Sequence, residues 1–187
     1  GNLVIEAKRE SQGGYDFTSS RIITESKQNF QYGRIDIRAA LPEGQGLWPA
    51  LWMLGSDFST VGWPRCGEID IMEMVGGNGR ENAVFGTAHW DDAGTPAKFG
   101  NTTTKTSGTF HDEFHVFSIL WNERTIRWYV DGTQYHAIDI TPEELAELRN
   151  EFFLIFNVAV GGTLPGSPDN TTRFPQYMIV DYVRYFQ

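Results

Sequence analysis

The stretch Thr125–Ile140, TIRWYVDGTQYHAIDI, shows the pattern that decides the fold of this chain. Two runs with a period of two, Thr125–Val130 and Gln134–Ile140, flank the pair Asp131-Gly132. Successive side chains of a strand point to opposite faces, and an Asp-Gly pair between two such runs is typical of a hairpin turn. The stretch therefore predicts two antiparallel strands joined by a tight turn.

The same period continues on both sides of this hairpin. In Phe30–Leu41 it places Ile35, Ile37 and Ala39 on one face, with charged residues on the other. Further strands are expected at Phe114–Trp121, Glu151–Val160 and Tyr177–Phe186. Two long loops are expected at Gly55–Gly67 and at Asp91–Asp112, which is rich in Thr, Gly and Asn.

One short helix interrupts the strands. Thr141-Pro142-Glu143-Glu144 combines an N-cap Thr, Pro at the first helical position and Glu at the third, which predicts a capping box and a helix through Leu145 and Leu148. Many strands, one small helix and frequent Gly or Pro turns indicate an all-β sandwich or barrel.

Length and composition narrow the function. The 187 residues fit one domain with a substantial core, and 40% hydrophobic with 21% charged residues is ordinary globular composition. The net charge is −9 and no basic run is present, which argues against nucleic acid and anionic membranes as partners. No apolar run approaches the length of a membrane span. No signal peptide is seen, as in a cytoplasmic protein or in a mature secreted chain.

The chemistry concentrates in Gly67–Gly76, GEIDIMEMVG, where three acids stand among Ile, Met and Val. Glu68 and Asp70 share a strand face, whereas Glu73 is one residue out of step. One extra residue in a β-bulge, most simply Met72, would bring all three acids to one face. Like charges at that spacing cannot all ionise freely, so at least one pKa is expected to rise. A polar edge strand with its acids in water is the alternative.

An ionised and a protonated carboxyl side by side are the equipment of glycoside hydrolysis. A retaining mechanism needs carboxyls about 5–5.5 Å apart, and an inverting one about 6.5–9.5 Å. We expect Glu68 to be the nucleophile, Glu73 the general acid and then base, and Asp70 to hold Glu68 and raise the pKa of Glu73. The sequence alone leaves open which Glu plays which part.

Several aromatic residues surround the acids in sequence. Sugar rings stack on aromatic side chains, and Trp48, Trp52 and Trp63 shortly precede the acids. Any single Trp is as readily a core residue as a sugar-stacking one. Trp63 is the best candidate for stacking, because VGWP is a loop context. Trp121 and Trp128 lie on alternating strands and are expected in the core.

Three polar residues are weaker candidates. His89 is able to bond a carboxylate or substrate, although a lone His is usually structural. Asn157 interrupts an apolar run, so its amide needs a partner inside the fold or in the cleft. Arg34 lies on the polar face of its strand, where a solvated surface position is the default. The single cysteine, Cys66, excludes an intrachain disulfide and is best interpreted as a small packed residue.

Taken together, these motifs resemble glycoside hydrolase family 16 and, within it, the laminarinase-like endo-β-1,3-glucanases. The similarity covers most of the chain in the family's order. The segments that carry it are GLWPALWMLG (Gly46–Gly55), VGWPRCGEIDIMEMVGG (Val61–Gly77), FGTAHW (Phe85–Trp90), FHVFSILW with IRWYVDG, FNVAVGG (Phe156–Gly162), PGSPDNTTRFPQ (Pro165–Gln176) and VDYVRYF (Val180–Phe186).

The resemblance implies a β-jelly-roll sandwich of two antiparallel sheets with a concave substrate cleft. The family motif E-x-D-x-x-E falls on Glu68, Asp70 and Glu73 as nucleophile, assisting acid and acid/base. It implies retaining endo-hydrolysis of laminarin-type or mixed-linkage β-glucans with no catalytic cofactor. It also implies a monomer that acts outside the cell. The cleft residues that it adds are Trp48, Trp52, Trp63, His89, Asn157 and Arg34.

The resemblance carries two further expectations. Some members hold a structural Ca²⁺ on the side away from the cleft near an Asp at the chain end, which makes Asp181, with Gly1, the candidate calcium site. Members usually carry a stretch before a segment like GNLVIEAKRE, so residues 1–187 are expected to be a single catalytic domain that lacks it.

Three other functions stay open at this stage. The first is a non-catalytic β-glucan-binding module, because jelly rolls also serve as lectins. The second is a galactan hydrolase acting on agar or carrageenan. The third is a transglycosylase.

Overall fold

Two antiparallel β-sheets form the molecule. The computed structural model describes residues 1–187. The strands are β1 (Leu3–Gln12), β2 (Tyr15–Thr18), β3 (Arg21–Ile23), β4 (Gly33–Ala40), β5 (Leu47–Gly55), β6 (Glu68–Glu73), β7 (Ala83–Asp92), β8 (Thr95–Thr104), β9 (His115–Trp121), β10 (Thr125–Val130), β11 (Thr133–Asp139), β12 (Phe152–Val160) and β13 (Gln176–Phe186). The helices are α1 (Phe58–Val61) and two 3₁₀ helices, Arg80–Asn82 and Glu143–Arg149.

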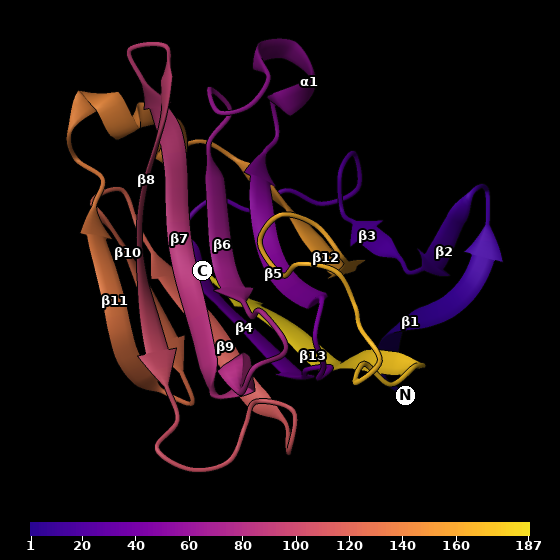
Figure 1. The fold of residues 1–187 in the computed structure, drawn as a ribbon. Helices are drawn as coiled ribbons and strands as arrows, with labels where there is room; N and C mark the ends of the chain where they lie inside the picture. The colour runs from indigo at the N-terminus through magenta and orange to yellow at the C-terminus, as the bar shows by residue number, and fades with distance from the viewer.

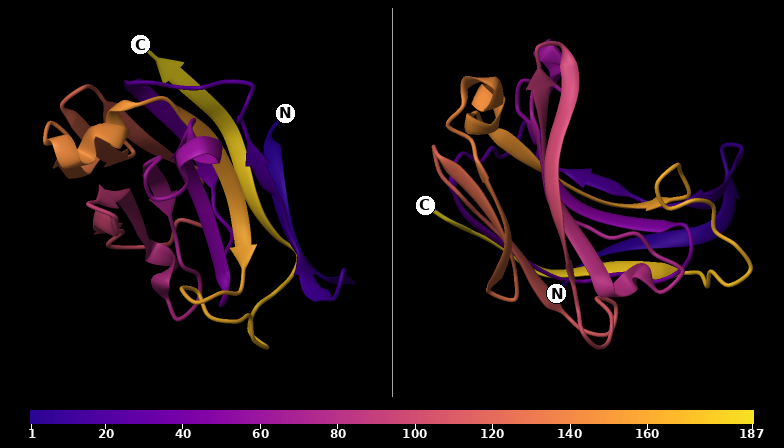
Figure 2. Two further views of the ribbon diagram at one scale, coloured as in Figure 1. Left: turned by 90° about the horizontal axis from the view of Figure 1, so that it is seen from above. Right: turned by 60° about the vertical axis from the view of Figure 1, so that its left-hand side comes forward.

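The sheets pack face to face (Figure 1). One has seven strands in the order β11-β10-β9-β4-β13-β1-β2, and the other has six in the order β3-β12-β5-β6-β7-β8. Both are twisted and curved (Figure 2). The predicted all-β sandwich of two antiparallel sheets is confirmed.

The hairpin predicted at Asp131-Gly132 is present. β10 and β11 pair antiparallel and close at Val130 opposite Thr133. Asp131 and Gly132 both have positive φ, 49° and 79°, which matches the two-residue turns that follow the right-handed twist of a hairpin. Local turn chemistry therefore sets the register next to the turn, and the register shifts once between Trp128 and Tyr129.

The loop expected at Asp91–Asp112 is wrong in its first half, because β8 lies there and pairs with β7 along its whole length. Ala93 and Gly94, with φ of 50° and 88°, make the turn between the two strands. β8 is an edge strand with most of its side chains in solvent, so it carries Thr and Asn instead of an apolar alternation. The loop expected at Gly55–Gly67 contains the single turn α1.

The capping box at Thr141 is also wrong. The helix begins after Pro142, no side chain caps it, and the Thr141 hydroxyl donates instead to Asp139 Oδ1 at 2.7 Å. It is a 3₁₀ helix with a kink at Leu145 (φ −110°). Leu145 and Leu148 are nevertheless buried, so packing on the sandwich holds this segment in place of capping.

The core lies between the sheets, and alternation divides the two faces of the six-stranded sheet. On β5, Leu51 and Met53 are buried in the core, whereas Trp48 and Trp52 project from the outer face into cavities. Trp121 and Trp128 are buried at 1% and 0% exposure, which confirms the prediction that they are core residues. No helix is both long and apolar enough to cross a membrane.

Candidate active site

The acidic strand β6 contains the expected bulge. On β5, Leu51 pairs with Met72 and Trp52 pairs with Asp70, so Ile71 is the extra residue. Ile71 and Met72 both point into the core, at 1% and 0% exposure. The β-bulge is confirmed, but the extra residue is Ile71 and not Met72 as expected.

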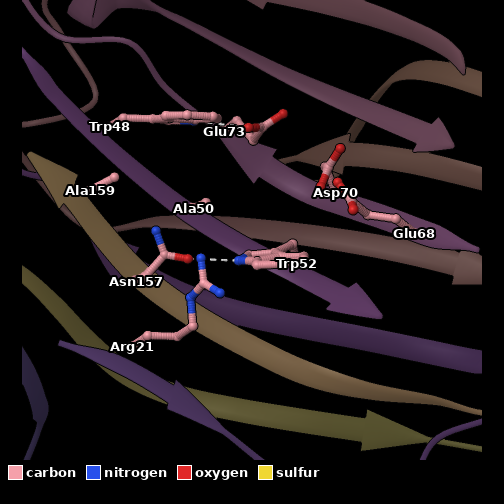
Figure 3. A pocket seen from close by; sticks show the side chains of 9 residues that line it. All are labelled: Arg21, Trp48, Ala50, Trp52, Glu68, Asp70, Glu73, Asn157 and Ala159. Carbon is pink, nitrogen blue, oxygen red and sulfur yellow. Dashed lines mark hydrogen bonds between the residues drawn. The ribbon is translucent and has the colours of Figure 1, made fainter. Parts of the chain in front are cut away.

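The bulge restores the phase of the last acid. Glu68, Asp70 and Glu73 all line one cavity of about 170 Å³ on the outer face of the six-stranded sheet (Figure 3). In a regular strand Glu73 would face the core together with Ile69 and Ile71. The edge-strand alternative fails, because β6 is flanked by β5 and β7 and only Glu68 of the three acids is more than 9% exposed.

The central cavity continues in both directions across the sheet. Towards β7 and β8 it meets a cavity of about 660 Å³ that shares Trp48, Glu68 and Glu73 with it. Towards β3 and α1 it meets one of about 350 Å³ that shares Arg21, Trp52 and Glu68. The three cavities form a cleft that crosses the strands, with the acids on its floor.

Burial dominates the electrostatics of the acids. Desolvation, followed by repulsion from Asp70, raises the pKa of Glu68 to about 8 and the pKa of Glu73 to about 8. Burial also raises the pKa of Asp70. A charged carboxylate is disfavoured in a low-dielectric site, so the expectation that at least one of these pKa values rises is confirmed. Protonated carboxyls are therefore favoured on the cleft floor near neutral pH.

Two neighbours distinguish the acids. Trp48 Nε1 donates to Glu73 Oε1 at 2.8 Å. His89 Nε2 lies 3.0 Å from Asp70 Oδ2 and 3.7 Å from Glu68 Oε1. Burial lowers the pKa of His89, which favours the neutral ring at neutral pH. Glu73 thus has an indole donor of its own, while Glu68 and Asp70 share the imidazole.

A second polar group lies on the neighbouring strands. Trp52 Nε1 donates to Asn157 Oδ1 at 2.8 Å, which supplies the partner that a buried amide needs. The Arg21 guanidinium lies over the Trp52 ring at 5.3 Å from its centroid. Figure 3 shows Arg21, Asn157 and Trp52 together opposite the acids.

Arg21 takes the place expected of Arg34. Arg34 lies on β4 of the other sheet, where its Nε donates to Asp36 Oδ1 at 2.7 Å, so the expectation that it lines the cleft is wrong. Arg21 was missed because it begins a three-residue strand that is too short to show a pattern of its own. Pairing of β3 with β12, Arg21 opposite Asn157, brings it to the cleft.

Trp63 lies at the edge of the cleft beyond Glu68. Its side chain is 47% exposed and lines the cavity that extends towards α1. Its ring centroid is 6.2 Å from that of His89, at 54° between the planes. An exposed indole beside an acid is available to stack on a sugar face.

The calcium site expected at Asp181 and Gly1 stays a prediction. Asp181 is the only carboxylate assigned to it, and Asp181 Oδ2 already accepts from Arg38 Nη1 at 2.7 Å. Ca²⁺ takes six to eight oxygen ligands from carboxylates, backbone or amide carbonyls and waters. Glu68, Asp70 and His89 form the one group whose potential ligand atoms converge, within 4.8 Å of one another. That group lies on the cleft floor, in the six-stranded sheet, whereas Asp181 lies on β13 of the seven-stranded sheet.

Comparison with known proteins agrees with this architecture. The β-glucanase of Rhodothermus marinus is 40% identical over 202 residues, covering 100% of this chain and 68% of the relative. The clotting factor G alpha subunit of Tachypleus tridentatus is 36% identical over 189 residues, covering 100% of this chain but 27% of the relative. The chain thus spans between about a quarter and about two thirds of the curated relatives it matches first.

Solved structures show the same fold. The laminarinase catalytic domain from Thermotoga maritima MSB8 is 49% identical, superposes with a TM-score of 0.87, and is matched over 99% of this chain and 77% of that one. The endo-β-1,3-glucanase from Pyrococcus furiosus is 43% identical with a TM-score of 0.87, covering 98% and 74%. The family model for glycosyl hydrolases family 16 matches residues 2–183. The chain therefore belongs to glycoside hydrolase family 16.

Proposed function

We propose that this chain hydrolyses internal β-1,3-glucosidic bonds of laminarin-type glucans by double displacement with retention at the anomeric carbon. The observation that carries the proposal is the convergence of Glu68, Asp70 and Glu73 on the floor of one cleft, achieved by a bulge in β6. A buried set of three acids is costly for a fold and has a direct use in glycoside hydrolysis.

In the first step Glu68 attacks the anomeric carbon as a carboxylate, and Glu73 gives its proton to the departing glycosidic oxygen. The raised pKa of Glu73 fits its role as the acid, because it keeps the carboxyl protonated at neutral pH. The pKa of Glu68 is raised equally, so the reactive form is the one in which Glu68 is ionised and Glu73 is protonated, and the raised pKa alone does not assign the two roles. In the second step Glu73, now a carboxylate, takes a proton from the water that attacks the glycosyl–Glu68 ester. Asp70 and His89 lie beside Glu68, where they orient it.

The cleft supports an internal cut in a chain polymer, because the cavities continue on both sides of the acids. The names of the relatives support β-1,3-glucan as substrate, and two Rhizobium meliloti relatives named endo-1,3-1,4-beta-glycanase extend the candidates to mixed-linkage glucan. A second candidate function is glucan binding without hydrolysis, since a beta-1,3-glucan-binding protein of Penaeus monodon is 34% identical over 189 residues.

The test is reducing-sugar release from laminarin, barley mixed-linkage glucan, agarose and carrageenan, by the native chain and by Glu68→Gln. We expect release from laminarin that disappears in Glu68→Gln while laminarin binding and the circular dichroism spectrum are retained. Proton NMR of the first product should show the β-anomer before mutarotation. Binding of laminarin without release from any glucan would favour the binding function, and an initial α-anomer would refute double displacement.

A further inference from the structure

A tryptophan of the other sheet reaches the bulge that aims the acids. Trp128 on β10 is fully buried between the sheets, and its Nε1 donates to the backbone carbonyl oxygen of Asp70 at 2.8 Å. Asp70 directly precedes the extra residue Ile71. The bond therefore joins the seven-stranded sheet to the point at which the six-stranded sheet departs from a regular ladder.

The indole is enclosed on several sides. Gly86 on β7 lies opposite Ile71 and Met72, and a Cβ atom there would lie 2.7 Å from Trp128 Nε1 and 2.6 Å from the Tyr135 hydroxyl. On another side the His136 ring packs on the indole at 4.6 Å between centroids and 30° between planes. Any larger residue at position 86 would displace the indole, so glycine there permits the orientation in which Trp128 reaches the Asp70 carbonyl.

The bond matters because the bulge decides where Glu73 points. A buried carbonyl without a donor is unfavourable, and Asp70 lies where the pairing with both neighbours shifts register. Without the indole N–H, the peptide after Asp70 is free to turn towards another donor. Such a turn would re-aim Asp70 and Glu73, whose side chains lie on either side of the bulge.

We propose that Trp128 is a positioning residue for the hydrolysis: its indole N–H holds the Asp70 carbonyl and thereby fixes the bulge that directs Asp70 and Glu73 into the cleft. The inference rests on the proposed function, since misplaced acids would lower the rate of hydrolysis. It also makes a prediction that needs no activity, because re-aimed carboxyls would titrate differently.

The experiment compares Trp128→Phe with Trp121→Phe. Trp121 on β9 is a matched control: it is equally buried, and its Nε1 also donates to a backbone carbonyl, that of Leu148 at 3.1 Å, but this bond leads to the 3₁₀ helix Glu143–Arg149. Both variants lose one buried indole donor and keep an aromatic ring. A lower kcat in Trp128→Phe than in Trp121→Phe would therefore be attributed to the lost bond to Asp70 and not to the loss of a buried indole in general.

We expect Trp128→Phe to lower kcat on laminarin about 100-fold with KM almost unchanged, which is the loss typical of reacting groups displaced by about 1 Å. Trp121→Phe should keep the native kcat at a similar loss of Tm. A native kcat in Trp128→Phe would overturn the proposal. An equal loss of kcat in both variants would overturn it too, because general destabilisation would then explain the effect.

A second variant covers failure of Trp128→Phe to fold. Benzothienylalanine, incorporated at position 128 by stop-codon suppression, has the shape of tryptophan but sulfur in place of the N–H donor. The proposal expects the same loss of kcat at close to native Tm, and full activity would refute it.

A chain without hydrolysis on any glucan would refute the proposed function and leave this inference testable. Carboxyl ¹³C NMR titration of Asp70 and Glu73 should change in the benzothienylalanine variant but not in Trp121→Phe. Unchanged titration curves in the former would overturn the positioning role by themselves.

Discussion

The pH dependence of hydrolysis should respond to a single indole N–H. Trp48 Nε1 donates to Glu73 Oε1 at 2.8 Å and stabilises the charged form of that carboxyl. Trp48→Phe keeps an aromatic ring in the cleft but removes this donor. The pKa of Glu73, already raised to about 8 by burial, should therefore rise further.

The size of the effect follows from the geometry. Glu73 is 9% exposed, so solvent replaces the lost donor poorly. A hydrogen bond to a charged group is worth about 1.5–3 kcal/mol, and about 1.36 kcal/mol corresponds to a pKa shift of one unit. Because the protonated form of Glu73 is the active one, kcat/KM falls as the pH rises through this pKa. The fall should therefore move to a higher pH by about one to two units in Trp48→Phe.

The assay is kcat/KM on laminarin from pH 5 to about 10.5, fitted for the midpoint of the alkaline limb and not for its height. Trp52→Phe is the matched control, since its indole lies on the same strand face but donates to the neutral amide of Asn157. An unmoved midpoint in Trp48→Phe would refute the reasoning. An equal movement in Trp52→Phe would refute it as well, because the effect would then be general to the cleft.

Three further predictions follow from the cleft. Deleting Ile71 removes the bulge but leaves Asp70 and Glu73 two residues apart, which keeps both on the cleft face of a regular strand, so laminarin hydrolysis should survive; an inactive deletion with a native circular dichroism spectrum would contradict this phase argument. Trp63→Ala should raise KM with little change of Tm, because the indole is 47% exposed; a large fall in Tm with native KM would make it a structural residue. Arg21→Ala should raise KM and Arg34→Ala should not, since only Arg21 lines the cleft; equal KM values for the two variants would contradict this assignment.

Much of the fold could be predicted because strand alternation is a local property. The period of two placed Ile35, Ile37 and Ala39 on the core side, and all three are fully buried. The Asp131-Gly132 turn was visible because positive φ at both central residues selects such pairs. β8 escaped prediction because an edge strand in solvent needs no apolar alternation.

The acids were predictable for a related reason. Three carboxyls inside an apolar run are unfavourable unless they serve a site, and the spacing of Glu73 from Asp70 required an extra residue for all three to share a face. The sequence could not say which residue that is, since Ile71 and Met72 are both apolar and both end in the core. Pairing with Leu51 and Trp52 of β5 decides for Ile71.

By itself, the sequence determined the all-β class, the hairpin at Asp131-Gly132 and the acidic strand, because each follows from local patterns of neighbouring residues; the choice of a sandwich over a barrel came from the family resemblance. Only the tertiary structure decided that Arg21 and not Arg34 faces the acids, and that Trp128 holds the Asp70 carbonyl from the other sheet. The physical reason is that strand neighbours are chosen by pairing and packing between residues far apart in the chain. Arg21 opposite Asn157 is such a pair, and no local pattern records it.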